Sequence, residues 1–176
     1  MSVLKKPLRF TREDADRAHR EWGCNCGPGA IAAVMGLTLD ELRPHMGDFE
    51  QKRYTNPTLM WQVLRRLDVR FIHAQPNNDS SWPSYGLARI QWEGPWTAPG
   101  VPMVARYRHT HWVGAQWGAK PGDPMSVGIF DINCMNSSGW VALEDWSSTI
   151  VPWLLRELHP KANGRWHITH AVEIHL

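Results

Sequence analysis

The sequence has few cysteines and no long apolar stretch. Its three cysteines, two of them separated by a single residue, do not have the spacing of a disulfide framework. No run approaches the ~20 apolar residues of a membrane-spanning helix, and the first residues lack the apolar core and cleavage site of a signal peptide. We therefore expect a reduced thiol protein of the cytoplasm that does not contact a membrane.

An excess of charge, internal repeats and low-complexity linkers are also missing. The 19 basic and 17 acidic residues give a formal charge of +2, which is too small to indicate a polyanionic partner such as nucleic acid. A chain of 176 residues without a linker predicts a single domain over residues 1–176. The 11 tryptophans are the unusual feature, because they need a sizeable core or a lined groove.

What the sequence does contain is a thiol at the start of a predicted helix. Pro28 falls in the first turn after Cys26, where its missing N–H costs nothing. The small and apolar run 30–34 predicts close packing, and Gly36 predicts the end of the helix. Free N–H groups and the helix dipole favour a thiolate at such a position. Cys26 is therefore the candidate nucleophile, and an inert core cysteine is the alternative.

Two later residues are candidates for its partners. His111 opens the apolar run 112–115, which predicts a buried strand able to hold an imidazole rigidly. Asp131 lies in the apolar run 127–132, and a charged residue there needs a partner that an imidazolium can provide. Asn133 lies two residues further and is the alternate third member of the group.

Together these residues resemble the papain-like cysteine peptidases. Cys26-Gly27-Pro28 is similar to the start of their nucleophile helix, and His111 and Asp131 match the order of base and orienting residue. The closest branch is the bacterial bacteriocin-leader (double-glycine) peptidases. The resemblance implies an α+β fold, with N-terminal helices and the nucleophile helix packed on a C-terminal antiparallel β-sheet. It also implies hydrolysis of a peptide or isopeptide bond through an acyl-thioester, a peptide or protein substrate, and no cofactor or metal.

The chain departs from that family at one position. Papain-like peptidases usually carry a glutamine six residues before the nucleophile, where it donates to the oxyanion, but this chain has Arg20 there. The N–H of Cys26 remains as one donor, so Arg20, His19 or Asn25 has to supply the other. The loss of one such donor typically costs on the order of 10²–10³ in rate.

Three alternatives stay open at this point. A deamidase or an acyltransferase would use the same triad. A catalytically weak or inactive binding domain on the same fold would use its tryptophans to line a groove. A zinc site would combine Cys24 and Cys26 with His109 and His111, although structural zinc sites usually separate their cysteines by about two to four residues.

The order of the predicted elements supports the α+β class. Helices are expected after Thr11, from Cys26, after Thr38 in a capping box, and after Asn56. Residues 75–86 predict a loop. Strands are expected at 69–74, 87–92, 101–107, 111–117, 125–132 and 166–176, and one or two helices at 141–158. Helices followed by an antiparallel sheet are typical of α+β proteins.

Overall fold

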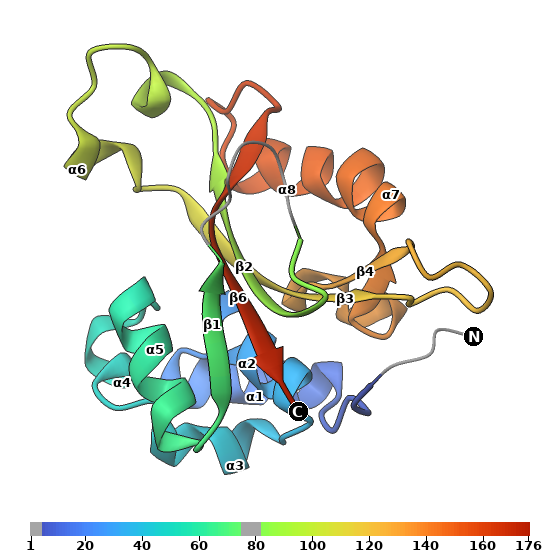
Figure 1. The fold of residues 1–176 in the computed structure, drawn as a ribbon. Coiled ribbons are helices and arrows are strands. Elements are labelled where there is room, and N and C mark those ends of the chain that lie inside the picture. The colour runs from blue at the N-terminus through green and yellow to red at the C-terminus, as the bar shows by residue number, and fades with distance from the viewer. Residues whose placement is uncertain (1–4, 75–81) are drawn as a thin grey trace.

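The computed structural model describes residues 5–74 and 82–176 (Figure 1). Its α-helices are α1 (Arg12–Trp22), α2 (Cys26–Met35), α3 (Leu39–Leu42), α4 (Phe49–Lys52), α5 (Pro57–Arg66), α6 (Met103–Arg106), α7 (Leu143–Asp145) and α8 (Val151–Leu158). The 3₁₀ turns are η1 (Arg43–His45), η2 (Pro95–Thr97) and η3 (Ile132–Ser137), and η4 (Trp146–Ile150) is a π-helical turn. The strands are β1 (Arg70–Ala74), β2 (Tyr85–Trp92), β3 (Thr110–Trp117), β4 (Val127–Phe130), β5 (Trp140–Ala142) and β6 (Trp166–His175).

These strands form one six-stranded sheet in the order β1-β6-β2-β3-β4-β5. Every neighbouring pair is antiparallel. The last strand, β6, lies between β1 and β2 (Figure 1), so the C-terminal part of the chain is inside the sheet. The prediction of an α+β fold with N-terminal helices and an antiparallel sheet is confirmed.

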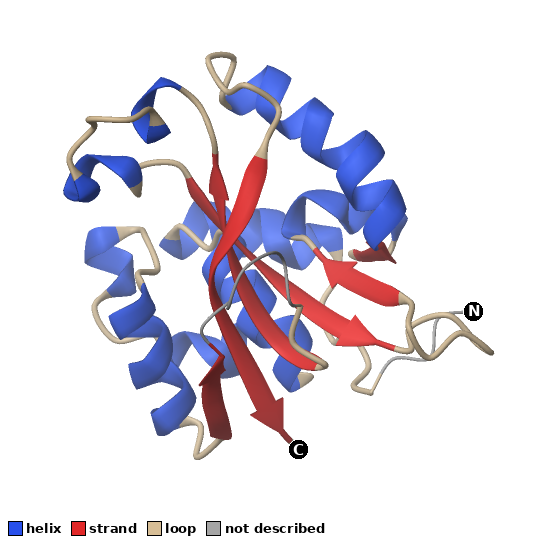
Figure 2. Cartoon of the chain, turned by 45° about the horizontal axis from the view of Figure 1, so that its top comes forward, coloured by secondary structure: helices blue, strands red, loops and turns tan. Residues whose placement is uncertain are grey.

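Helices cover both faces of this sheet (Figure 2). Helices α1 to α5 and one face of the sheet form one hydrophobic core, and η4 and α8 form a second core on the opposite face. Side chains of the strands alternate between the two cores. Leu87 of β2 lies in the first core and Ala88 in the second; on β3, Trp112 lies in the first core and Val113 in the second. Because both faces are covered, every residue of β2 is buried.

The helix starts have the caps that the sequence predicts. The hydroxyls of Thr11 and Thr38 accept hydrogen bonds from the N–H groups of Asp14 (3.2 Å) and Glu41 (3.1 Å), each within a capping box. Asn56 caps α5 through its side chain. These caps satisfy N–H groups that have no acceptor inside a helix.

Helix α2 packs against β3 at very short range. A Cβ built on Gly114 of β3 would lie 2.8 Å from Cγ2 of Val34 in α2 and 3.1 Å from Cβ of Phe130. A Cβ on Gly27, at the start of α2, would collide with the side chain of Thr55. The predicted close packing of this helix is therefore confirmed, and it depends on glycine at the contact points. Gly36 ends α2 in the left-handed conformation with φ 65°, also as predicted.

Residues 101–107 do not form the predicted strand. They contain the helical turn α6, which follows Pro102 and is held by a hydrogen bond from Nε of Arg106 to the carbonyl of Val101 (2.8 Å). Figure 1 shows α6 on a protrusion away from the sheet. The apolar residues that suggested a strand are not buried there, since Val104 is 91% exposed.

Other boundaries also differ from the predictions. β4 ends at Phe130, so Asp131 follows the strand instead of lying within it and caps the turn η3. The predicted loop at 75–86 is shorter, because Tyr85 and Gly86 belong to β2, while residues 75–81 lie outside the described residues. Residues 143–158 form one continuous helical segment of α7, η4 and α8, with Pro152 in the first turn of α8. Within the described ranges, no helix is long and apolar enough to cross a membrane.

Candidate active site

Cys26 is the first residue of α2. The side chain of Asn25 caps the helix by accepting a hydrogen bond from the N–H of Gly27 (3.3 Å). The amide nitrogen of Asn25 donates to the carbonyl of Arg53 (3.1 Å), which fixes the cap to a neighbouring loop. The N–H of Cys26 has no acceptor inside the helix at this position. The half-buried thiol therefore lies at the positive end of the helix dipole.

His111 lies near the start of β3 and contacts Asp131. Its Nε2 is 2.9 Å from Oδ2 of Asp131, and its ring stacks on Trp92 with the centroids 5.8 Å apart and the planes at 26°. Only 8% of His111 is exposed. Because the carboxylate engages Nε2, the other ring nitrogen is left for the hydrogen bond between His111 and Cys26. The side chains of Cys26, His111 and Asp131 are thus connected in that order.

Asp131 is fully buried and surrounded by donors. Oδ1 accepts from both the backbone N–H and the side-chain amide of Asn133 (2.9 Å each). Oδ2 accepts from Nε1 of Trp146 (2.9 Å) in addition to its contact with His111. A buried carboxylate is stable only with such partners, and together they fix its orientation toward the imidazole.

The charges of this group shift one another's pKa values. Burial raises the pKa of Cys26, but the charge of His111, its hydrogen bond and the N–H of Trp112 lower it below its ordinary value. Burial lowers the pKa of His111, but Asp131 and Cys26 raise it well above its ordinary value. Burial raises the pKa of Asp131, whereas His111, Trp146 and the backbone of Asn133 lower it overall. These directions favour a thiolate and an imidazolium beside an ionised carboxylate.

The other two cysteines have different surroundings. Cys24 is 1% exposed, and burial together with the charge of Cys26 raises its pKa to about 12. Cys134 is 3% exposed, and burial together with the charge of Asp131 raises its pKa to about 12. Both thiols therefore stay protonated at neutral pH, and Cys26 is the one cysteine of the chain with a lowered pKa.

The four supporting candidates lie in different places. The amide of Asn25 is committed to the cap and to the carbonyl of Arg53. Arg20 is exposed on α1 and is not part of the cavity at Cys26, whereas His19 lines that cavity and holds Nδ1 3.0 Å from the carbonyl of Cys24. Asn133 contacts Asp131 and so orients the carboxylate instead of replacing it.

The residues of the zinc alternative are not assembled. His109 lies in the turn before β3, and its ring is 4.1 Å from that of Trp96 and 4.8 Å from that of His159. Across residues 5–74 and 82–176, no group of three or more His, Cys, Asp or Glu side chains is placed to hold a metal ion. The Cys24, Cys26, His109 and His111 set therefore does not form a metal centre in this structure.

A cavity of about 510 Å³ opens onto the thiol. Cys26 and His111 line it together with residues of α1, η3 and α8, including His19, Asn133 and Trp153. Its volume lies within the usual range for ligand sites, about 300–1,000 Å³. The candidate nucleophile and base therefore share one accessible space.

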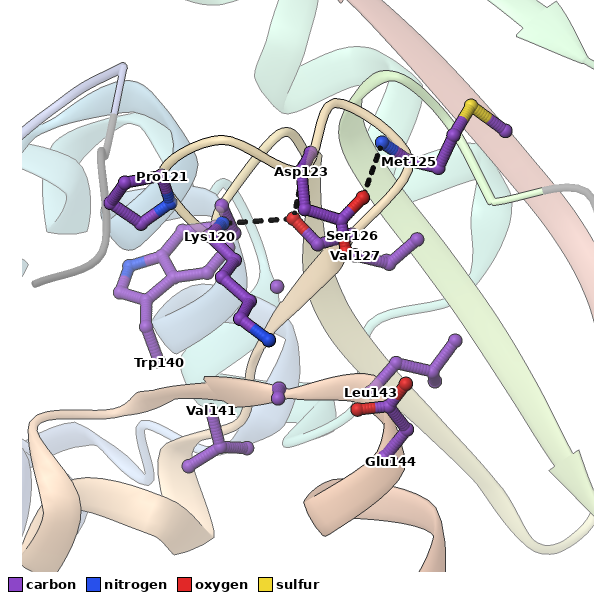
Figure 3. Close-up of a pocket in the computed structure, with 13 residues that line it drawn as sticks. Lys120, Pro121, Asp123, Met125, Ser126, Val127, Trp140, Val141, Leu143 and Glu144 are labelled. Atoms are coloured by element: carbon purple, nitrogen blue, oxygen red, sulfur yellow. Dashed lines mark hydrogen bonds between the residues drawn. The ribbon is translucent and has the colours of Figure 1, made fainter.

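Another cavity, of about 550 Å³, lies between the loop that precedes β4 and the segment β5–α7 (Figure 3). The loop is closed by hydrogen bonds from the N–H of Lys120 to the hydroxyl of Ser126 (2.8 Å) and from the N–H of Met125 to Asp123 (3.1 Å). The residues that line it include Lys120 and Glu144 but neither cysteine nor histidine. This cavity therefore offers no nucleophile and base comparable to Cys26 and His111.

Two tryptophans belong to the site and were missed from the sequence. Trp146 donates to Asp131, and Trp92 stacks on both His111 and Trp146. The signal that points to them is weak: a tryptophan in an apolar run reveals neither where its N–H is directed nor which ring it covers. Comparison of the chain with protein-family models, curated proteins and solved structures finds no match.

Proposed function

We propose that the protein is a papain-like cysteine hydrolase that cleaves a peptide or isopeptide bond of a peptide or protein substrate. Cys26 is the nucleophile, His111 transfers the proton, and Asp131 orients His111. The observation that carries this proposal is the buried contact between His111 and Asp131 beside a helix-terminal thiol whose pKa is lowered. A small core cysteine has no need of such neighbours.

The reaction starts from the thiolate and the imidazolium. The sulfur of Cys26 attacks the carbonyl carbon of the scissile amide, a C–S bond forms, and the carbonyl electron pair moves onto oxygen. His111 then donates a proton to the leaving nitrogen as the C–N bond breaks. The amine product leaves, and the acyl group remains on Cys26 as a thioester.

Water completes the cycle. Neutral His111 takes a proton from a water molecule, which attacks the thioester carbonyl. The C–S bond breaks, the carboxylic acid product leaves, and the thiolate and imidazolium are restored. Asp131 supports both halves, because its buried negative charge favours the protonated ring and holds Nε2 in place.

The N–H of Cys26 at the start of α2 is the first donor for the oxyanion. His19 is the second candidate, because it lines the same cavity. Its Nδ1 is held on the carbonyl of Cys24, which leaves Nε2 as the ring nitrogen for the oxyanion. This arrangement replaces the glutamine that papain-like peptidases usually carry at the position of Arg20.

The proposal can be tested with a peptide library prepared from a digested proteome whose amino groups have been blocked. Wild-type protein is expected to create new amino termini, which mass spectrometry identifies, and Cys26→Ala is expected to create none. Cys24→Ala is the matched control, because it removes a thiol two residues away and should retain the cleavages. The same cleavages by Cys26→Ala as by wild type would overturn the proposal.

A further inference from the structure

Arg89 is a buried arginine in the middle of the sheet. It lies on β2, directly opposite Trp112 on β3 and His170 on β6. Directly opposed residues of antiparallel strands point to the same face of the sheet. Only 8% of Arg89 is exposed, which is unusual for a residue that is always charged.

The guanidinium of Arg89 is incompletely satisfied. Nη2 donates to the hydroxyl of Thr110 (3.2 Å), and the group lies over the ring of Tyr107, 5.6 Å from its centroid. Nε is buried and has no hydrogen-bond partner among residues 5–74 and 82–176. The charged groups that act on Arg89 are Tyr107 and Cys26, and no carboxylate of the described residues is among them.

Several surface arginines of the same chain differ from Arg89 because they are paired with carboxylates. Three arginines at the surface each form an ion pair with a carboxylate: Arg9 with Glu41, Arg17 with Asp40, and Arg43 with Glu50. Surface pairs of this kind contribute little to stability, whereas a buried charge without a counter-ion is costly. Arg89 is buried and therefore needs a carboxylate more than these surface arginines do, yet no carboxylate of the described residues is among the charged groups that act on it.

Arg89 is also next to the candidate nucleophile. The N–H of Trp112, its opposite neighbour on β3, forms a hydrogen bond with the sulfur of Cys26, and the charge of Cys26 acts on Arg89. On the other side, burial lowers the pKa of His170, and the charges of Arg89 and His73 lower it further. The surroundings of Arg89 and His170 therefore disfavour a further cation and suit an anion.

We propose that Arg89 binds a carboxylate of the substrate, so that the enzyme selects peptides with an acidic side chain or a free α-carboxylate close to the scissile amide. Arginine suits this role because its planar fork matches a carboxylate with two parallel hydrogen bonds. Nε, which has no hydrogen-bond partner among the described residues, is one edge of that fork. The inference rests on the function proposed for Cys26 and names its class of substrate.

The test compares two small alkylating agents that differ in charge. Iodoacetamide is neutral, whereas iodoacetate brings a carboxylate to the thiol. The rate of modification of Cys26 by each is measured at pH 6 by peptide mapping, and the iodoacetate-to-iodoacetamide ratio is compared with that of glutathione. A carboxylate site at Arg89 should raise the ratio for Cys26 by about 10-fold or more over glutathione.

Protection of the wild-type protein distinguishes the two sources of the carboxylate. N-acetylaspartate α-amide carries only a side-chain carboxylate, and N-acetylalanine carries only an α-carboxylate. The one that slows alkylation of Cys26 by iodoacetamide identifies the group that Arg89 binds. N-acetylasparagine α-amide, which has neither carboxylate, is the control and should give no protection.

Variants assign the effect to Arg89. Arg89→Met should lower the ratio by about 10-fold toward that of glutathione, whereas Arg65→Met, which removes an exposed arginine from α5, should leave it unchanged. A wild-type ratio equal to that of glutathione, with no protection by either carboxylate, would overturn the inference. Slow labelling by iodoacetamide alone would count against the activated thiol and not against the carboxylate site, so the two proposals fail separately.

Discussion

The thiol of Cys26 can be compared with the thiols of the two other cysteines in the chain. The pKa of its thiol is lowered, whereas those of Cys24 and Cys134 are raised to about 12. We expect iodoacetamide to modify Cys26 rapidly at pH 6, where an ordinary thiol with a pKa near 8.5 reacts slowly. Cys24 and Cys134 should stay unmodified over the same time. Peptide mapping of samples quenched at intervals between pH 5 and pH 9 gives the three profiles.

The control for this profile is His111→Ala. The variant keeps most of the burial, which raises the pKa of Cys26, but loses the imidazolium that lowers it. The profile should move to higher pH, and the rate at pH 6 should fall by about 10-fold or more, because one pKa unit changes the thiolate fraction about tenfold. An unchanged profile would mean that His111 does not set the reactivity of Cys26.

Asp131 links the site to the stability of the fold. Its folded pKa lies below the unfolded value of about 4, so the charged carboxylate stabilises the protein above that pH and loses this effect as the pH falls through the folded pKa. Asp131→Asn should therefore lower the free energy of unfolding by roughly 3 kcal/mol at pH 6, and by less in acid. Urea denaturation of both proteins at pH 6 and pH 3.5 measures this, and an equal difference at both would contradict it.

Some residues of the candidate site can be predicted from the sequence, and others cannot. Cys26, His111 and Asp131 could be proposed from their order and local context, and the structure brings them together. Trp146 could not, because its N–H reaches Asp131 only through the fold of η4 against the sheet. Local sequence carries the backbone preferences of a residue but not the direction of a side chain that closes a long-range contact.

The close contact between helix α2 and strand β3 can be used to test how packing between elements affects stability. In Gly114→Ala the new methyl group would lie 2.8 Å from Val34, so the helix or strand must shift. Such overpacking typically costs about 1–3 kcal/mol of stability. The same substitution made in a Val34→Ala background should cost less, because the colliding methyl is gone. Thermal and urea denaturation of the four proteins give the coupling, and equal costs in both backgrounds would contradict it.

The caps of α2 and α5 provide a matched pair. Asn25→Ala and Asn56→Ala each remove an asparagine that caps a helix of ten residues, and each should lower the free energy of unfolding by about 1 kcal/mol. Only Asn25→Ala should also slow the modification of Cys26, because it disturbs the turn that carries the thiol. Urea denaturation and the iodoacetamide assay separate the effects, and equal labelling rates in the two variants would contradict this role of Asn25.

The elements that the sequence predicts well are those whose signals lie within their own residues. Capped helices such as α5, with Asn56 and an apolar stripe, depend on their own residues. The segment 101–107 has the composition of a strand, but it forms the helical turn α6 on a protrusion away from the sheet (Figure 1). Strand pairing is a property of the whole sheet, and periodicity within seven residues does not reveal whether a partner exists.

For the molecule as a whole, the two buried thiols show whether the two cores unfold cooperatively. Cys24 belongs to the core on one face of the sheet and Cys134 to the core on the other. If the faces unfold together, both thiols become reactive only through global opening, and a thiol reagent in excess should modify them at the same slow rate. Addition of dilute urea should accelerate both equally. A rate for Cys134 that rises earlier would show that its core opens separately.

The position of β6 inside the sheet has a consequence for folding during synthesis of the chain. Residues 166–175 emerge from the ribosome after every other residue of the sheet, yet they form the strand between β1 and β2. Until they arrive, β2 lacks one of its neighbours, and the sheet that aligns His111 with Cys26 is incomplete. Such long-range pairing forms late. The pairing of β2 with β6 therefore forms only after residues 166–175 have been synthesised, and the sheet around His111 is complete only from that point.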